Sequence, residues 1–432
     1  MSEQRASWQR CDACGAEFDE LDAAPRCRAC GGLLAIVHQA PSGDPAQWRA
    51  RFAASCCARP SATASGVWRF GEVVLPTAMG VAVTHPEGNT PLIVRPALGR
   101  WADLEDLLLK HEGHNPTGSF KDRGMTVGVT QAKRIGATAV ACASTGNTSA
   151  SLAAYAAQAG LPALVFVPEG QIALGKLTQS LAYGARTLLV EGDFDACLQL
   201  VQESSEALGI YLLNSINPFR LEGQKTIVLE MLQQLDWEVP DWIVLPAGNL
   251  GNTAAFGKAL LEAQSWGLIS RLPRIAAIQA EGASPFAQSF ARDFDRLVPM
   301  AAHTVATAIK IGAPASYDRA VRAIRATRGV VRSVPDAEIL AAKAAIDAAG
   351  VGCEPASAAT LAGVRRLRAE GVIRPGERVV GILTGHVLKD PGILQTMHQE
   401  TEPPPSWANR PIRIAPEVAA VRTVLEAALA TK

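Results

Sequence analysis

The sequence lacks any excess of charge. Its 432 residues carry 41 Lys and Arg against 41 Asp and Glu, so the formal net charge at pH 7 is zero. Proteins that bind nucleic acids or membrane surfaces usually carry net positive charge, so this balance argues against both kinds of partner. The chain is long enough for two or three domains around a large buried core.

The N-terminal segment also lacks the apolar stretch of a secretory signal peptide. The cysteines number nine, an odd count in a long chain, whereas disulfide frameworks are typical of small secreted proteins. We therefore expect a cytoplasmic protein whose thiols stay reduced.

Residues 135–168 contain no Asp, Glu, Lys, Arg or His. Glycine, serine, asparagine, glutamine and proline interrupt this window, so it is not the run of about 20 apolar residues that a membrane-spanning helix needs. The window instead predicts a strand at 138–143, a polar loop at 144–148, a helix at 149–159 and a strand at 164–167. Strands that are apolar on both faces belong to parallel sheets covered by helices, so we expect a buried βαβ unit.

Apolar runs alternate with helical patterns over most of the chain, which predicts an α/β fold. Further expected strands are Leu107–Lys110, Thr187–Val190, Trp242–Leu245, Ile275–Gln279 and Val379–Leu383. The expected segments are a ribbon-like unit at 1–40, a lead-in and first part of a large domain at 41–120, a small α/β domain at 121–220, the rest of the large domain at 221–402, and a tail at 403–432. The tail ends in a helix whose apolar stripe we expect to pack on the body or on a partner subunit, formed by Val418, Val421, Leu425 and Leu429.

Four cysteines form two pairs near the N-terminus, Cys11 with Cys14 and Cys27 with Cys30, each followed by glycine. Thiolates at this spacing can bind one Zn²⁺ tetrahedrally, so we expect a closed structural zinc site. The gap between the pairs is shorter than the usual span of about 15–20 residues, which leaves a small fold with weak or absent metal as the alternative. Residues 1–40 carry four Arg and six Asp or Glu, the wrong balance for binding phosphates of nucleic acid.

Residues 115–123 read Asn-Pro-Thr-Gly-Ser-Phe-Lys-Asp-Arg. Ser119 can cap a helix that starts near Phe120, which places Lys121 in the first turn. The helix dipole is positive there, and burial would lower the pKa of the lysine. Lys121 is thus a candidate Schiff-base nucleophile, although most lysines near helix starts are simply solvated.

Three further polar segments are candidate anion sites. The loop Ser144–Thr148 opens a helix and offers N–H groups to a small carboxylate, unless it is an ordinary capped turn. Gly248–Asn252 follows a strand and lets the backbone approach a phosphate, although turns with two glycines are common. Asn214–Thr226 contains Arg220, which either binds a phosphate or carboxylate with two N–H groups or is a surface residue.

Residues 170–176 match the Walker spacing, but Leu177 stands where Ser or Thr must hold Mg²⁺, so we exclude a P-loop NTPase. Lys176 remains a candidate phosphate contact. Thr384 follows the strand Val379–Leu383, at the carboxyl end where parallel sheets bind ligands. His386 in the same loop is a candidate acid or base, or neither.

Between about Trp68 and Pro391 these motifs resemble threonine synthases, which are pyridoxal-phosphate enzymes of fold type II. The segments that carry the resemblance are Pro86–Pro91, Asn115–Arg123, Ala143–Asn147, Asn214–Thr226, Gly248–Asn252, Ile278–Pro285, Thr307–Gly312, Glu354–Ala358 and Thr384–Pro391. Two departures are Val387, where Gly is common, and Thr-His-Pro before Glu87, where Leu-Gly is usual. The resemblance implies two open, mostly parallel αβα domains after a zinc-ribbon-like segment, and a homodimer.

The resemblance also implies a reaction, the conversion of O-phospho-L-homoserine and water into L-threonine and phosphate by a carbon–oxygen lyase. Lys121 would hold the cofactor and move protons, Asn147 would bond the ring hydroxyl, and Thr384 the ring nitrogen. The cofactor phosphate would bind to Gly248, Asn249, Leu250, Gly251 and Asn252. The substrate carboxylate would bind to Ser144, Thr145 and Thr148, and the substrate phosphate to Lys176, Asn214, Ser215 and Arg220.

Two rivals remain at this point. A sister enzyme on the same fold, such as a cysteate synthase or a Ser/Thr dehydratase, would share the cofactor site. A dehydratase needs no clamp for a substrate phosphate, so Lys176 with Asn214–Arg220 favours a phosphorylated substrate. The second rival, a nucleic-acid-binding regulator without catalysis, is disfavoured by the acidic ribbon and by Lys121.

Overall fold

The computed structural model describes residues 6–39, 43–56, 61–144, 146–169, 177–192 and 194–430. Its contacts divide the chain into two units, Met1–Asp390 and Pro391–Lys432. The first unit contains three sheets. Its helices are α1 (Pro45–Cys56), α2 (Gly71–Val74), α3 (Pro96–Ala102), α4 (Lys121–Arg134), α5 (Asn147–Ala159), α6 (Thr178–Ala182), α7 (Phe194–Leu208), α8 (Pro218–Gln234), α9 (Gly251–Ser265), α10 (Pro285–Phe290), α11 (Tyr317–Ala326), α12 (Asp336–Ala348) and α13 (Pro355–Ala369).

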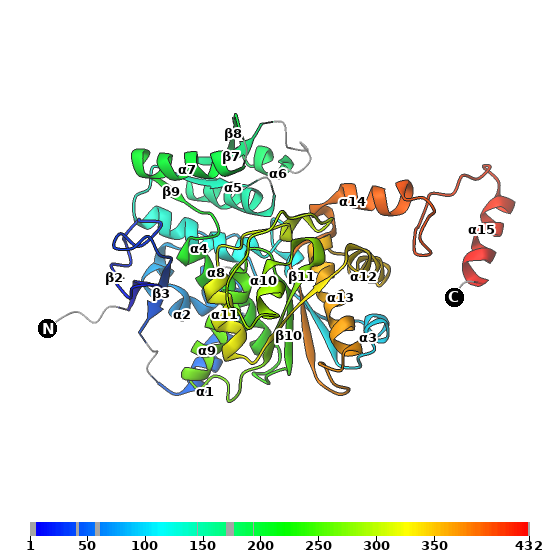
Figure 1. Ribbon diagram of the computed structural model, residues 1–432, viewed down its shortest axis with the longest axis horizontal. Coiled ribbons are helices and arrows are strands. Elements are labelled where there is room, and N and C mark those ends of the chain that lie inside the picture. The colour runs from blue at the N-terminus through cyan, green and yellow to red at the C-terminus, as the bar shows by residue number, and fades with distance from the viewer. Residues whose placement is uncertain are drawn as a thin grey trace. The chain divides into compact units, whose positions relative to one another are not determined.

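The smaller α/β sheet is entirely parallel, with the strand order β8-β7-β6-β9, and α5 and α7 pack against it (Figure 1). Its strands are β6 (Ala139–Ala143), β7 (Ala163–Pro168), β8 (Arg186–Val190) and β9 (Ile210–Leu212). The βαβ unit expected in the charge-free window is therefore confirmed. Helix α5 begins at Asn147, inside the segment predicted as loop, and ends where Gly160 takes a left-handed conformation with φ of 69°.

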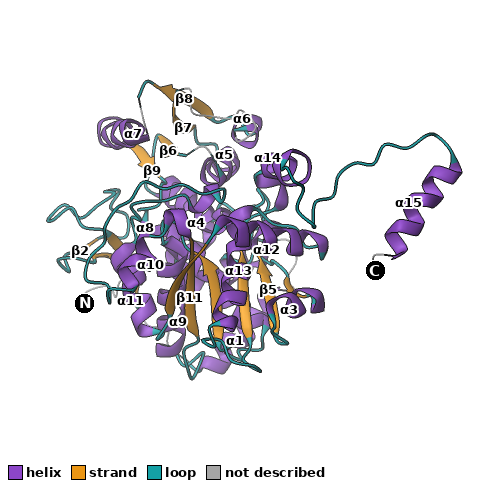
Figure 2. Ribbon diagram, turned by 45° about the vertical axis from the view of Figure 1, so that its right-hand side comes forward, coloured by secondary structure: helices purple, strands orange, loops and turns teal. Residues whose placement is uncertain are grey.

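The larger sheet has the order β12-β11-β10-β13-β5-β4, and only the edge strand β4 runs antiparallel to its neighbour. Its strands are β4 (Leu92–Val94), β5 (Leu107–His111), β10 (Trp242–Pro246), β11 (Arg274–Ala280), β12 (Val330–Val334) and β13 (Val379–Leu383). Alternate residues of β10 enter two separate apolar clusters, Ile243 and Leu245 in one, Trp242 and Val244 in the other. Both faces of the sheet are thus covered, as Figure 2 shows by the helices around it.

Helices α4 and α8 cross very closely because glycines stand at the crossing. A Cβ on Gly223 would lie 1.7 Å from the carbonyl oxygen of Arg123, and one on Gly124 would lie 2.9 Å from that of Arg220. Only glycine fits at such distances. The crossing brings the first turn of α4, with Lys121, next to the first turn of α8.

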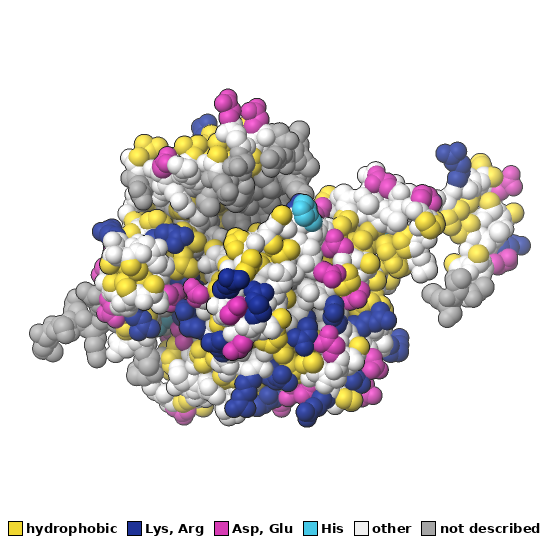
Figure 3. All heavy atoms as spheres, in the orientation of Figure 1, with side chains coloured by type: hydrophobic (Ala, Val, Ile, Leu, Met, Phe, Trp, Pro, Cys, Tyr) yellow, Lys and Arg dark blue, Asp and Glu magenta, His cyan; other side chains and the backbone are white. Residues whose placement is uncertain are grey.

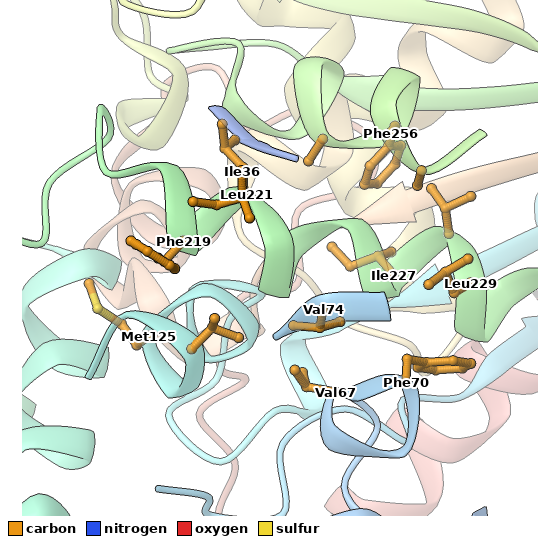
Figure 4. Packing of buried hydrophobic residues seen from close by; sticks show 14 of the residues in the cluster. Ile36, Val67, Phe70, Val74, Met125, Phe219, Leu221, Ile227, Leu229 and Phe256 are labelled. Carbon is orange, nitrogen blue, oxygen red and sulfur yellow. The ribbon is translucent and has the colours of Figure 1, made fainter. Parts of the chain in front are cut away.

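The N-terminal segment of the first unit, called here the cysteine unit, forms a small antiparallel sheet. Its strands are β1 (Ser7–Cys11), β2 (Glu17–Phe18) and β3 (Leu34–His38), in the order β2-β1-β3. Its own apolar core contains only Cys11, Cys27 and Leu34, with Ala16 and Phe18 packed at its edge. Ile36 of β3 instead joins the main core, in the same cluster as Leu221 of α8 (Figure 4).

The second unit contains α14 (Pro391–Gln395), a π-helical turn at Thr396–Glu400 and α15 (Val418–Ala430). The last helix starts two residues after Pro416. Its apolar stripe has exposed side chains, from 53 % at Val421 to 79 % at Val418, so packing of this stripe stays a prediction.

Charged side chains of both signs are interspersed on the face of the protein drawn in Figure 3, in keeping with the zero net charge. No helix among the described residues is both long and apolar enough to cross a membrane.

Candidate active site

Lys121 is the first residue of α4, and it is half-buried. The pKa of this amine is lowered to about 7, chiefly by burial and then by the positive charge of Arg220, while Glu354 opposes the shift. The helix start is fixed from the large sheet, because the amide of Phe120 donates to the carbonyl of Thr384 at 3.0 Å. A pKa near 7 leaves much of this amine unprotonated near neutral pH, which is what a nucleophilic lysine needs.

Glu354 is the buried residue that precedes α13. Its carboxylate accepts a hydrogen bond of 2.9 Å from the side-chain amide of Asn147 and one of 3.0 Å from the hydroxyl of Thr384. The Thr384 hydroxyl also lies 3.0 Å from that of Ser357. Burial raises the pKa of Glu354, although both hydrogen bonds favour its ionised form.

Sequence analysis assigns no role to Glu354 or Ser357, although both stand in a motif that carries the resemblance. Asn147 lies 207 residues from Glu354 in the sequence, so their contact could not be seen there. The structure thus joins Lys121, Asn147 and Thr384 around a carboxylate that the sequence left unassigned.

The turn that leads into α9 forms a cradle suited to an anion. A Cβ on Gly248 would lie 3.0 Å from the Cα of Ile309, so the backbone there is closely packed. Leu250 takes a left-handed conformation with φ of 63°, which turns the chain into the helix. The buried side-chain oxygens of Asn252 and Thr253 have no hydrogen-bond partner among the described residues. Buried polar atoms rarely lack partners, and a helix start attracts anions, so this cradle suits an anionic ligand.

Thr253 was not among the residues singled out from the sequence, because the predicted phosphate-binding turn ended at Asn252. Helix α9 starts at Gly251, so Thr253 lies within its first turn. The run Gly-Asn-Leu-Gly-Asn-Thr carried the signal, since a hydroxyl that follows a glycine-rich turn is a common phosphate contact.

Asn249 connects this cradle to the segment that contains Ser215. The side-chain amide of Asn249 donates to the Ser215 hydroxyl at 3.0 Å. Its side-chain oxygen accepts from the amide of Ala315 at 2.8 Å, and its carbonyl accepts from the amide of Ser316 at 3.3 Å. Three separate parts of the chain therefore meet at Asn249.

Arg220 lies in the first turn of α8 and is 2 % exposed. It donates to the carbonyl of Leu213 at 3.2 Å, and its Nε has no partner among the described residues. Burial lowers the pKa of its guanidinium to about 10, which still leaves it charged at neutral pH. A buried and partly unpaired cation beside Lys121 favours binding of an anion.

The remaining predicted site residues are those expected to bind the substrate. Ser144 and Thr148 are half-buried on either side of the start of α5, and the Ser144 hydroxyl accepts from the backbone two residues on at 3.3 Å. Asn214 uses its side-chain oxygen within its own turn, accepting from Ile216 at 3.1 Å. Thr145 and Lys176 lie outside the described residues.

His386 caps the turn after β13, where its Nδ1 accepts from the amide of Leu388 at 3.2 Å. Burial lowers the pKa of this imidazole, and His114 and Lys389 lower it further. His386 is therefore neutral at pH 7, with one ring nitrogen engaged by the backbone.

A buried network of charged side chains lies next to the candidate site. Arg123 donates to Glu112 at 2.7 Å and to Glu230 at 2.9 Å, and Lys110 donates to Glu230 at 2.6 Å. Glu230 also accepts from the amide of Thr90 at 2.9 Å, which fixes the loop Pro86–Pro91. Its three cationic neighbours, Arg123, Lys110 and Arg69, hold the pKa of Glu230 well below its usual range. Such a network is rigid because each charge has a partner.

The four N-terminal cysteines form a cluster whose sulfur atoms all lie within 4.8 Å of one another. The Sγ atoms of Cys11 and Cys30 are 3.5 Å apart, and those of Cys14 and Cys27 are 3.6 Å apart. Four thiolates at about 2.3 Å from one tetrahedral Zn²⁺ would stand about 3.8 Å apart. The cluster therefore has the size of a site that could bind zinc.

Comparison with known proteins gives concordant results. Residues 83–385 match the family described as pyridoxal-phosphate dependent enzyme. The threonine synthase of Methanocaldococcus jannaschii is 44 % identical over 89 % of this chain and 93 % of its own. That of Methanosarcina acetivorans is 47 % identical over 88 % of this chain and 92 % of its own. The crystal structure of threonine synthase from Escherichia coli covers 98 % of this chain and 100 % of its own with a TM-score of 0.71 at 20 % identity, which supports the fold.

Proposed function

The chain belongs to the threonine synthase family of pyridoxal-phosphate-dependent enzymes, and from this premise we propose that it converts O-phospho-L-homoserine and water into L-threonine and phosphate. The observation that carries the proposal is the hydrogen bond between Asn249 and Ser215. It joins two helix starts that suit anions, those of α9 and α8, beside the half-buried Lys121. One site suits the phosphate of the cofactor, and the other suits the phosphate of a substrate.

The described residues fit pyridoxal phosphate. Its aldehyde reacts with an unprotonated amine, and the pKa of Lys121 lies near 7. Its phosphate suits the start of α9, where the buried Thr253 hydroxyl is free to donate among the described residues. When bound, the cofactor supplies an electron sink for negative charge that develops on the substrate.

We assign the following work to the chain's own side chains. Asn147 would hold the ring hydroxyl of the cofactor and Thr384 its ring nitrogen, and both side chains donate hydrogen bonds to Glu354. Lys121 takes the proton from Cα of the substrate and returns protons later in the reaction. Its pKa near 7 suits both directions of transfer.

The substrate is held at its two charged ends. The carboxylate binds at the start of α5 between Ser144 and Thr148, where backbone N–H groups are available. The phosphate binds to Arg220, Asn214 and Ser215, and the guanidinium stabilises it as it leaves from Cγ. Thr145 and Lys176 complete these two sites in the proposal. Water then adds at Cβ to give the hydroxyl of threonine.

The alternative is a sister reaction on the same scaffold, either cysteate formation from phosphoserine or deamination of serine or threonine. The test is to incubate the purified protein with O-phospho-L-homoserine, O-phospho-L-serine and L-threonine in parallel and to identify the products. We expect threonine and phosphate from the first only. Release of a 2-oxo acid from threonine at a comparable rate would favour the dehydratase instead.

We further propose that the cysteine cluster binds one Zn²⁺, that the protein is a homodimer and that it works in the cytoplasm. The sulfur distances support zinc, and an odd number of cysteines in a long chain suits a reducing compartment. Metal analysis of the purified protein and light scattering coupled to gel filtration test the first two proposals. Fewer than about one zinc per two chains, or a monomer at micromolar concentration, would refute them.

A further inference from the structure

The N-terminal cysteine unit, residues 6–39, contacts four helices, of which three carry a part of the candidate active site and the fourth, α11, follows the residues that hold Asn249. The contacts are Glu20 with Arg134 of α4, His38 with Glu222 of α8, Ile36 with Lys258 of α9, and Asp12 with Arg319 of α11. Helices α4 and α8 carry Lys121 and Arg220 in their first turns, and α9 starts from the cradle. The cysteine unit therefore contacts the helices that position the site residues, although it contains none of the proposed active-site residues itself.

One of these contacts leads to the cradle for the cofactor phosphate. Asp12 pairs with Arg319, in the first turn of α11, at 2.5 Å. The two residues before that helix, Ala315 and Ser316, hold Asn249 through their backbone amides at 2.8 and 3.3 Å. Arg319 also donates to a carbonyl of β3 at 2.6 Å, and Arg322 of α11 pairs with Asp12 at 3.1 Å, so α11 makes three polar contacts with the unit. A displacement of α11 would therefore displace Asn249.

A second contact leads to the proposed site for the substrate phosphate. The imidazole of His38 lies 2.6 Å from the carboxylate of Glu222, two residues after Arg220. Glu222 also pairs with Lys225 at 2.6 Å and with Lys258, so the contact is part of a buried network between α8 and α9. The cysteine unit therefore contacts α8 near its first turn as well as α11.

The position of Asp12 depends on the cysteine cluster, because Asp12 lies between the two cysteines of the first pair. The apolar core of the unit is too small to hold its fold alone, since it buries only Cys11, Cys27 and Leu34. In units of this size, metal binding supplies the free energy of folding. Without metal, the turn around Asp12 loses its anchor and the ion pair to Arg319 weakens.

We propose that the cysteine unit is a metal-dependent brace, in which Zn²⁺ at the four cysteines holds Asp12 against Arg319 and thereby sets the affinity of the cradle for the cofactor phosphate. The inference rests on the zinc and cofactor sites proposed above and not on the identity of the substrate. Asp12 is a positioning residue, since it acts through Arg319 and Asn249. Loss of the metal then weakens cofactor binding while Lys121 remains intact.

The test compares cofactor binding with and without the phosphate group. The full-length protein, stripped of cofactor, is titrated with pyridoxal phosphate and, separately, with pyridoxal, which lacks the phosphate. Cys14→Ser removes one metal ligand, whereas Asp12→Asn removes the ion pair and leaves the ligands. Arg28→Gln is the matched control, because Arg28 is an exposed charge whose partner, Asp22, lies in the same unit. Zinc content and thermal unfolding are measured for each variant.

We expect wild type and Asp12→Asn to retain zinc and Cys14→Ser to lose it. Both variants should bind pyridoxal phosphate about tenfold more weakly, with a change of less than about twofold for pyridoxal. Asp12→Glu, which keeps the charge, should retain most of the affinity, and Arg28→Gln should match wild type. If Cys14→Ser does not fold, the affinities of Asp12→Asn for pyridoxal phosphate and pyridoxal still test whether the ion pair of Asp12 with Arg319 controls phosphate binding.

Equal weakening for the two ligands would overturn the inference, because a general loosening of the fold does not distinguish them. Loss of zinc with unchanged affinity for pyridoxal phosphate, or a wild type without zinc, would overturn it as well. The readout is cofactor affinity, so it stays decisive even if the wild type forms no threonine.

Discussion

The side-chain amide of Asn147 donates a hydrogen bond of 2.9 Å to the carboxylate of Glu354. Asn147 begins α5 beside the smaller sheet, and Glu354 precedes α13 on the larger one, so this bond spans the two halves of the site. Glu354 also accepts from Thr384 and lies close enough to Lys121 to affect its pKa. One buried carboxylate therefore governs both the placement of two proposed cofactor ligands and the charge of the proposed nucleophile.

The pH dependence of cofactor attachment follows from Lys121. Its pKa is lowered to about 7, and only the neutral amine attacks an aldehyde, so attachment should be fast above pH 7 and slow below it. At pH 6 roughly one tenth of the amine is neutral, so the rate should fall about tenfold from its plateau. Stopped-flow absorbance after mixing stripped protein with pyridoxal phosphate measures this profile. A midpoint above pH 9, as for a solvated lysine, would contradict the burial argument.

Two substitutions should move that midpoint in opposite directions. The negative charge of Glu354 raises the pKa of Lys121, so Glu354→Gln should move the midpoint to lower pH. Arg220 lowers the same pKa, so Arg220→Gln should move the midpoint to higher pH. The same stopped-flow profile is recorded for both variants. Shifts in the same direction would show that general damage to the site, not charge, dominates.

The cradle should reject a side chain at Gly248. A methyl group there would press against Ile309, with its Cβ 3.0 Å from a backbone atom. Gly248→Ala should weaken binding of pyridoxal phosphate at least about tenfold, because a close contact between backbone and phosphate is lost. Gly80→Ala is the control, since a Cβ at Gly80 meets no atom within 4 Å. Fluorescence titration gives both dissociation constants, and equal values would refute the placement of the cradle.

The buried charge network should dominate stability at the site. Glu230→Gln leaves three cations with one fewer carboxylate, which should cost about 3–5 kcal/mol of unfolding free energy. The exposed Glu105 offers the control Glu105→Gln, with an expected change below about 0.5 kcal/mol. Urea denaturation measures both, and similar losses in the two variants would contradict the assigned role.

The same carboxylate predicts a pH effect in the wild type. Its pKa in the folded protein lies well below the usual value, so its contribution is complete above about pH 4.5 and is lost as the pH falls further. Urea midpoints measured from pH 6 to pH 3 should therefore fall more steeply in wild type than in Glu230→Gln. Parallel curves would contradict this.

Much of the fold could be predicted from the sequence, because long apolar runs report buried parallel strands. All seven expected strands occur, and their ends differ by at most one residue at either side. In the two larger sheets the missed strands are β4 and β9, which have three residues each, and β12, whose run Val-Val-Arg-Ser-Val mixes polar and apolar residues. Short or polar strands are stabilised by pairing with neighbouring strands of the sheet. Such pairing leaves no signal in the strand's own sequence.

The residues of the candidate site likewise divide into those with a local sequence signal and those without one. Lys121, Arg220 and the residues of the cradle were predicted because each stands at a helix start with a local signature. Glu354 was not, since its effect arises from partners that lie 207 and 30 residues away. The charge network of Arg123 and Glu230 likewise pairs residues 107 positions apart. Contacts of this kind depend on the tertiary fold and leave no local pattern.

The most direct test of the proposed reaction follows oxygen. The purified protein is incubated with O-phospho-L-homoserine in ¹⁸O-labelled water, and the labels in threonine and in phosphate are read by mass spectrometry. Elimination of phosphate from Cγ followed by addition of water at Cβ predicts one ¹⁸O in the threonine hydroxyl and none in the released phosphate. Homoserine as the product with label in the phosphate, or no threonine at all, would contradict the account.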